Sequence, residues 1–187
     1  MDLDLATKGI IAANILAIIL AIALGWDFST IIWMYWFESV IIGFYTFLGL
    51  FFKALLSGKE IRKKLGIAFF FPVHYGGFHL GYLVFLAFLV PPTEFGAILL
   101  GSVVFLLSHG FSFIRSLGEK FDPEKEFMMP YLRIVPMHLT ILFGGILMAV
   151  GVHVLVMVFF MGLKTAADVV AHQVKHKKWH VKQLGKA

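Results

Sequence analysis

The chain has 187 residues, of which 60% are hydrophobic and only 14% are charged. A soluble domain carries about 25% charged residues, so this composition excludes a soluble globular protein and predicts a single helical membrane domain. There is no cysteine, which excludes disulfides and thiolate metal ligands. Basic loops beside anionic membrane lipids explain the net charge of +5, and no nucleic-acid partner is needed.

Apolar runs set the number of membrane crossings, since about 20 residues are needed to cross roughly 30 Å of hydrocarbon. Four such runs precede a longer one, 134–163, which divides near Gly151. Residues 115–133, interrupted by Pro123 and Pro130, form the only sizeable loop. They are interpreted as a connector, with a short amphipathic surface element as the alternative. We predict an all-α, polytopic integral membrane protein with a six-transmembrane-helix bundle and a basic tail, with helices at about residues 8–25, 29–53, 66–90, 95–116, 131–150 and 152–176 and the tail at 177–187.

The positions of Lys and Arg predict the orientation, because cytoplasmic loops carry an excess of them. They concentrate in residues 53–64, in residues 115–133 and after Leu163, whereas the connections around Asp27 and at 91–94 hold none. Six helices place all the basic segments on one side, and five would place the tail on the opposite side. We therefore predict that both termini are cytoplasmic.

Seven ionisable side chains interrupt the apolar segments. Each costs about 2.5–3.5 kcal/mol to insert near the bilayer centre, so such groups normally face one another or a wet cavity. Together they predict an intramembrane site. The seven are Glu38, His74, His79, His109, His138, Lys164 and Asp168.

Four of these residues come from four different helices and reach a similar depth. With a rise of ~1.5 Å per residue, they lie roughly 9–12 Å from the predicted cytoplasmic helix ends. Neutral imidazoles and a carboxylate suit Zn²⁺ or Fe²⁺, so we predict a divalent metal site, zinc or iron. The predicted ligands are His74, His109, His138 and Asp168.

The remaining groups receive supporting roles in this hypothesis. Glu38 and Lys164 are predicted catalytic groups or proton carriers, deeper in the membrane. His79 and His172 are additional ligand candidates. His79 lies about 140° around the helix from His74 and shares a side with Tyr75 and Tyr82.

Each residue also has a structural interpretation. Lys164 and Asp168, four residues apart, can neutralise each other as an ion pair, and Glu38 can hydrogen-bond to a tyrosine. A single transmembrane histidine often bonds a neighbouring helix, and His172 fits a solvated row at the lipid headgroups. Convergence of four potential ligands, three histidines and one aspartate, at one depth favours the functional interpretation.

Four sequence runs stand out along the chain: YWFES (35–39), HYGGFH (74–79), MHLTILFGG (137–145) and LKTAADVVAH (163–172). They resemble those of a family of small prokaryotic multi-pass membrane proteins, domain of unknown function 6498. The resemblance implies a multi-pass protein of the inner (plasma) membrane of a bacterium or archaeon, and it brings no activity.

Two characterised groups offer partial similarities. The progestin/adipoQ-receptor and alkaline-ceramidase group is similar in having intramembrane His, Asp and Ser around zinc, but this chain differs in helix number and histidine spacing. Rhomboid proteases share the six-helix count, but the run FLLSHGFSF (105–113) lacks their Gly-x-Ser-x-Gly motif. This argues against a serine protease.

The leading functional hypothesis is a metal-dependent lipid hydrolase, in which a metal-bound water attacks a lipid amide or ester. Three alternatives stay open. A haem protein would use two transmembrane histidines as axial ligands. A proton or ion pathway would use the acidic, basic and histidine groups as a relay, with a homodimer supplying more helices. A structural membrane subunit would use them only to join helices.

Overall fold

The structure is a computed structural model. It describes residues 23–118 and 120–132 continuously, and elsewhere residues 15, 19, 134, 135, 138, 139, 158, 159, 161–167, 169 and 170. The chain divides into two compact units, one formed by residues 29–131 and the other by residues 1–28 with 132–187.

The described residues are mostly helical and contain no strand, which confirms the all-α prediction. Among these residues, three helices are long and apolar enough to cross a membrane. The six-helix count and the cytoplasmic termini stay predictions. The helices are α2 (Phe28–Leu56), α3 (Ile61–Leu89), α4 (Phe95–Ser116) and the short α5 (Pro123–Met128).

The connection between α2 and α3 is shorter than predicted. α2 continues to Leu56, and α3 begins at Ile61 instead of residue 66. The turn is made by Gly58 and Glu60, whose φ angles of 65° and 50° lie in the left-handed region. Each 29-residue helix is about 44 Å long, more than the roughly 30 Å of hydrocarbon. The ends of both helices can therefore project beyond it.

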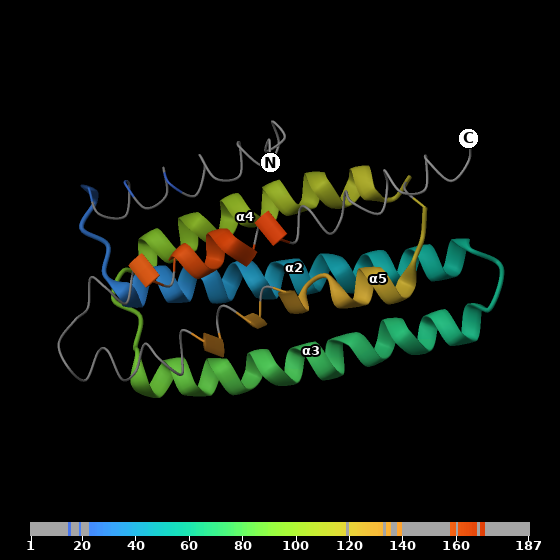
Figure 1. Ribbon diagram of the computed structural model, residues 1–187, viewed down its shortest axis with the longest axis horizontal. Coiled ribbons are helices and arrows are strands. Elements are labelled where there is room, and N and C mark those ends of the chain that lie inside the picture. The colour runs from blue at the N-terminus through green and yellow to red at the C-terminus, as the bar shows by residue number, and fades with distance from the viewer. Residues whose placement is uncertain are drawn as a thin grey trace. The chain divides into compact units, whose positions relative to one another are not determined.

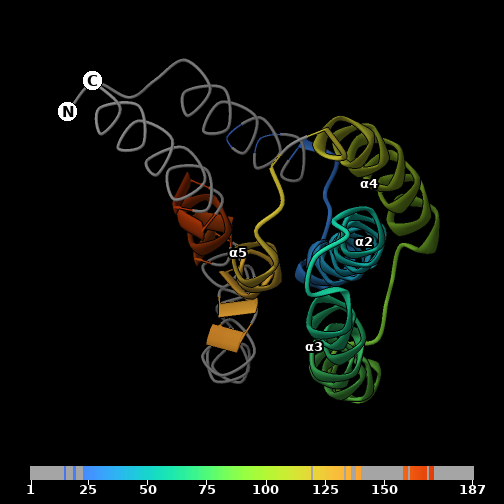
Figure 2. The ribbon, with the colours of Figure 1, turned by 90° about the vertical axis from the view of Figure 1, so that its right-hand side faces the viewer.

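α2 lies between α3 and α4 in both views (Figures 1 and 2). The first turns of α2 are hydrogen-bonded to the connection between α3 and α4. Ser29 donates a hydrogen bond to the Pro91 carbonyl at 2.6 Å, and the Trp33 indole donates to the Val90 carbonyl at 2.7 Å. The start of α2 and the α3–α4 connection, which holds no Lys or Arg, therefore share one end of this unit.

The basic segments meet at the other end of the same unit. The Lys53 ammonium lies 2.8 Å from the Glu126 carboxylate, and the Lys64 ammonium lies over the Phe121 ring, 5.7 Å from its centroid. These contacts join residues 53–64 to the segment that follows α4. Both basic segments thus lie on one side, as the charge pattern predicts.

The segment interpreted as a connector contains α5. Asp122 caps this helix, since its carboxylate accepts from the Lys125 backbone N–H at 3.1 Å, and Pro123 occupies the first turn. Phe127 stacks on Phe70 of α3, with ring centroids 6.0 Å apart. α5 is therefore a docked surface helix and not a plain linker.

Two glycines let α2 approach its neighbours. A Cβ atom at Gly43 of α2 would meet the ring of Tyr75 of α3, with its Cδ1 atom at 2.8 Å. On the other side, a Cβ atom at Gly110 of α4 would lie 2.7 Å from the hydroxyl of Tyr45 of α2. Small residues at these points allow aromatic side chains to lie against the neighbouring backbone.

The ion pair between Lys53 and Glu126 gives the first prediction. Lys53 is only 5% exposed, whereas the Glu126 side chain is 27% exposed. Glu126→Gln leaves a buried ammonium without this counter-charge and should cost about 3 kcal/mol. Lys53→Met leaves a partly solvated carboxylate and should cost about 1 kcal/mol. Equilibrium unfolding in mixed detergent micelles measures both, with Lys59→Met at an exposed position as the control. Equal losses from the two variants would contradict this asymmetry.

Candidate functional site

A buried hydrogen-bond cluster joins the middle of α2 to α3. The Ser39 hydroxyl lies 2.9 Å from the Nε2 atom of His79 and 2.9 Å from the Tyr75 hydroxyl. Ser39 has no exposed surface, and Tyr75 and His79 are only 3% and 4% exposed. The Tyr75 and His79 rings also stack, with centroids 4.3 Å apart. We call Ser39, Tyr75 and His79 the serine cluster.

Backbone carbonyls set the direction of these hydrogen bonds, because a carbonyl can only accept. The His79 Nδ1 atom donates to the Tyr75 carbonyl at 3.0 Å, so in the neutral ring Nε2 accepts from the Ser39 hydroxyl. The Tyr75 hydroxyl donates to the Ser39 carbonyl at 3.0 Å. The Trp36 indole donates to the His79 carbonyl at 3.2 Å. Both ring nitrogens of His79 are thus engaged, and the cluster works as a helix–helix connection.

A second polar contact joins α2 to α4. The Oε1 atom of Glu38 lies 3.6 Å from the Nε2 atom of His109. The Glu38 side chain is 7% exposed and that of His109 is 23% exposed. This separation is longer than a hydrogen bond but within the range of an ion pair. A small movement or one bridging water would allow a proton to pass between the two groups.

The face of α2 that carries Glu38 lies along α4. Met34, one turn before Glu38, lies against Gly101, and Tyr45, two turns after it, donates a hydrogen bond to the Leu106 carbonyl at 3.1 Å. Residues 34, 38 and 45 share one face of a helix. Ser39, the next residue, points about 100° away and meets α3. Adjacent residues of α2 therefore serve two different neighbours.

His74 of α3 lies in a third environment, beside Tyr131, which follows α5. Its Nδ1 atom is 2.7 Å from the Tyr131 hydroxyl, and its ring stacks on Phe70 with centroids 5.3 Å apart. The phenol is protonated at neutral pH and can donate to Nδ1. His74 is otherwise exposed. Its polar partner is thus a tyrosine, whereas that of His109 is an acid.

The other predicted site residues belong to the second compact unit. His138 is helical and exposed, and Lys164 is helical and half-buried. Asp168 and His172 lie outside the described residues. Within the described part of the chain, no three His, Asp or Glu side chains are close enough together to hold a metal ion. Since the predicted metal site includes Asp168, it stays a prediction.

Ser39 is the site residue that sequence reasoning missed. A hydroxyl is common in membrane helices, so Ser39 gave no signal of its own beside the carboxylate of Glu38. The spacing of Tyr75 and His79 does place them on one side of α3, and the structure shows that this side meets α2. A search for hydroxyls next to intramembrane acids would have suggested the serine cluster.

These observations describe a helical protein with helices long and apolar enough to cross a membrane, in which α2 makes buried polar contacts with both α3 and α4. The chain belongs to the family of unknown function DUF6498, whose model matches residues 1–184. No curated protein and no solved structure matches it.

The serine cluster gives the second prediction. Ser39→Ala removes the hydroxyl that donates to His79 Nε2 and lies 2.9 Å from the Tyr75 hydroxyl, and a buried polar atom left without its bond costs about 1–3 kcal/mol. Ser112→Ala is the matched control, because that exposed hydroxyl bonds only its own helix, at the Ser108 carbonyl. The control should change stability by less than about 0.5 kcal/mol. Thermal unfolding in detergent compares them, and equal stability of the two variants would count against the cluster.

Proposed function

We propose that this chain is a membrane-embedded protein that binds and transfers a proton at the Glu38–His109 pair. The supporting observation is the 3.6 Å separation between Glu38 Oε1 and His109 Nε2, with the carboxylate 7% exposed on a long apolar helix. Ionisable groups inside a membrane helix are costly to bury, and they are found in ion and proton pathways.

The chemistry of the pair suits a proton that moves in a medium of low dielectric. With one shared proton, the pair is either a neutral acid beside a neutral imidazole or a carboxylate beside an imidazolium. Both states have zero net charge, so the exchange avoids the cost of an isolated buried charge. Glu38 forms the inner end of the step, and the more exposed His109 forms the end from which a proton leaves or enters.

The contrast with the serine cluster supports a role beyond holding helices together. Both ring nitrogens of His79 are within 3.0 Å of a polar partner. The Glu38–His109 separation of 3.6 Å is longer, so a small movement can bring the two groups to hydrogen-bond distance or apart. In an enzyme, the same geometry would serve general acid–base catalysis.

The proposal also includes the topology. Six helices cross the plasma membrane of a prokaryotic cell, and both termini lie in the cytoplasm. The meeting of the basic segments at one end of residues 29–131 supports the orientation. Lys164 and Asp168 would act as further proton carriers. A homodimer would supply the additional helices that a transmembrane pathway usually needs.

A zinc or iron site at the same pair is a second proposal. Two ligands each about 2.1 Å from a tetrahedral metal have donor atoms about 3.4 Å apart, close to the observed separation. A metal held there would supply a bound water that attacks a lipid ester or amide. Metal analysis of the purified full chain tests this: about one equivalent that is lost in His109→Gln would favour the metal over the proton pathway.

Proton flux into proteoliposomes gives the third prediction. Glu38→Gln and His109→Gln should each lower the flux by about tenfold or more, which corresponds to a barrier increase of about 1.4 kcal/mol. His74→Gln is the matched control, since His74 bonds a tyrosine and not an acid, and it should retain most of the flux. Equal flux in all three variants and the unchanged chain would overturn the proposal.

Cysteine labelling gives the fourth prediction. The chain has no cysteine, so one introduced residue is the only target for a maleimide. In intact cells, a membrane-impermeant maleimide should label Glu94→Cys, while Lys59→Cys and Gln183→Cys should react only after permeabilisation. Labelling of Gln183→Cys in intact cells would contradict six helices, and labelling of Lys59→Cys would contradict the orientation.

A further inference from the structure

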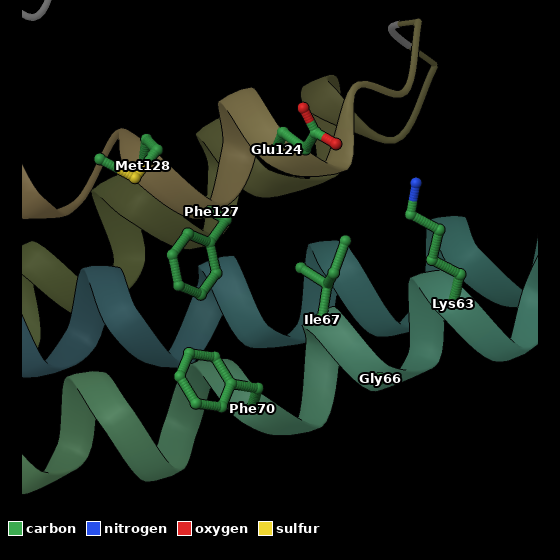
Figure 3. A pocket seen from close by; sticks show the side chains of 7 residues that line it. All are labelled: Lys63, Gly66, Ile67, Phe70, Glu124, Phe127 and Met128. Carbon is green, nitrogen blue, oxygen red and sulfur yellow. The ribbon is translucent and has the colours of Figure 1, made fainter.

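A cavity of about 460 Å³ lies between α3 and α5 (Figure 3). Its volume lies within the roughly 300–1,000 Å³ of pockets that bury small ligands. The apolar walls come from Ile67 and Phe70 of α3 and from Phe127 and Met128 of α5. No residue of the Glu38–His109 pair or of the serine cluster lines this cavity, so it is a separate site.

The cavity has a charged end and an apolar end. Lys63 of α3 and Glu124 of α5 line it near the starts of their helices (Figure 3). Phe70 and Met128 line it farther along the same two helices. Lys63 and Glu124 are exposed, and neither forms an ion pair with the other. The charged end of the cavity therefore offers one cationic and one anionic group to a ligand.

The charged end also lies at the basic end of the unit, where Lys53 pairs with Glu126. From there α3 continues as an apolar helix long enough to cross a membrane. A ligand in the cavity would have its polar group at the membrane surface and its apolar part directed toward the bilayer interior. This is the orientation of a phospholipid in one leaflet.

We infer that this cavity binds one phospholipid with an amine-bearing, zwitterionic headgroup. The Lys63 ammonium binds the phosphate, and the Glu124 carboxylate accepts hydrogen bonds from the headgroup amine. One acyl chain lies against the rings of Phe70 and Phe127. An anionic lipid without the amine would bring its negative charge to Glu124, so this carboxylate selects against it.

Gly66 provides a way to close the cavity without disturbing the helix. It also lines the cavity, and a Cβ atom built there meets nothing within 4 Å, so a larger side chain has space to enter. Gly66→Leu should fill the site. Gly77→Leu is its matched control, because Gly77 of the same helix is equally open and does not line the cavity.

Native mass spectrometry of the purified full chain tests the inference with phosphatidylethanolamine, phosphatidylglycerol and phosphatidylcholine of identical acyl chains. Phosphatidylethanolamine should bind one per chain and about fivefold more tightly than either other lipid, the size of one exposed charge pair. Gly66→Leu should abolish this preferred binding, and Lys63→Gln should weaken it by about fivefold. Gly77→Leu and Lys59→Gln should leave it unchanged.

Glu124→Gln tests the selection itself. It should remove the preference for phosphatidylethanolamine over phosphatidylglycerol, and Glu94→Gln, in a different connection, should keep that preference. The inference is overturned if Gly66→Leu with unchanged thermal stability binds the lipid as the unchanged chain does. It is also overturned if phosphatidylglycerol is preferred and Glu124→Gln changes nothing.

Discussion

Polar side chains inside a bilayer must find their partners within the protein, because hydrocarbon offers none. In residues 29–131, α2 is the helix on which this constraint acts most strongly. It carries Glu38 and Ser39 as neighbours in the sequence, and both are buried. Since successive residues of a helix point about 100° apart, the two side chains need two different neighbouring helices. The position of α2 between α3 and α4 meets that need (Figure 2).

The two contacts of α2 differ in character. On the α3 side, Ser39 and His79 form short hydrogen bonds whose directions are set by backbone carbonyls, and such a buried, satisfied network favours one arrangement of the helices. On the α4 side, Glu38 and His109 are 3.6 Å apart, and the histidine is partly exposed. The first contact is suited to holding α2 in place. The second, between side chains 3.6 Å apart, is the contact at which we propose proton transfer.

Sequence reasoning identified the long apolar helices and the side on which the basic segments lie, because length and charge depend on local composition. It also singled out Glu38 and His109, but it assigned them to different depths. Depth was counted from the predicted cytoplasmic end of each helix, on the assumption that these ends lie at one level. In the structure α2 continues to Leu56 and α4 ends at Ser116, yet Glu38 and His109 lie 3.6 Å apart, so the two ends lie at different levels. Pairing between helices therefore required the structure.

Other features left no periodic signal in the sequence. Lys53 and Glu126 lie in segments with many charges, so nothing marked them as partners. The docking of α5 depends on the stacking of Phe127 on Phe70, which is a contact between residues distant in sequence. The metal-ligand role of Asp168 stays a prediction, because that residue lies outside the described ones.

The central claim is that Glu38 and His109 exchange a proton. Infrared difference spectroscopy of the full chain between acidic and alkaline buffer measures it most directly, because a protonated carboxyl has its own C=O band. We expect a buried carboxyl band that disappears in Glu38→Gln and changes its pH dependence in His109→Gln. A Glu38 band with the same pH dependence in His109→Gln, or no band assignable to Glu38, would contradict the claim.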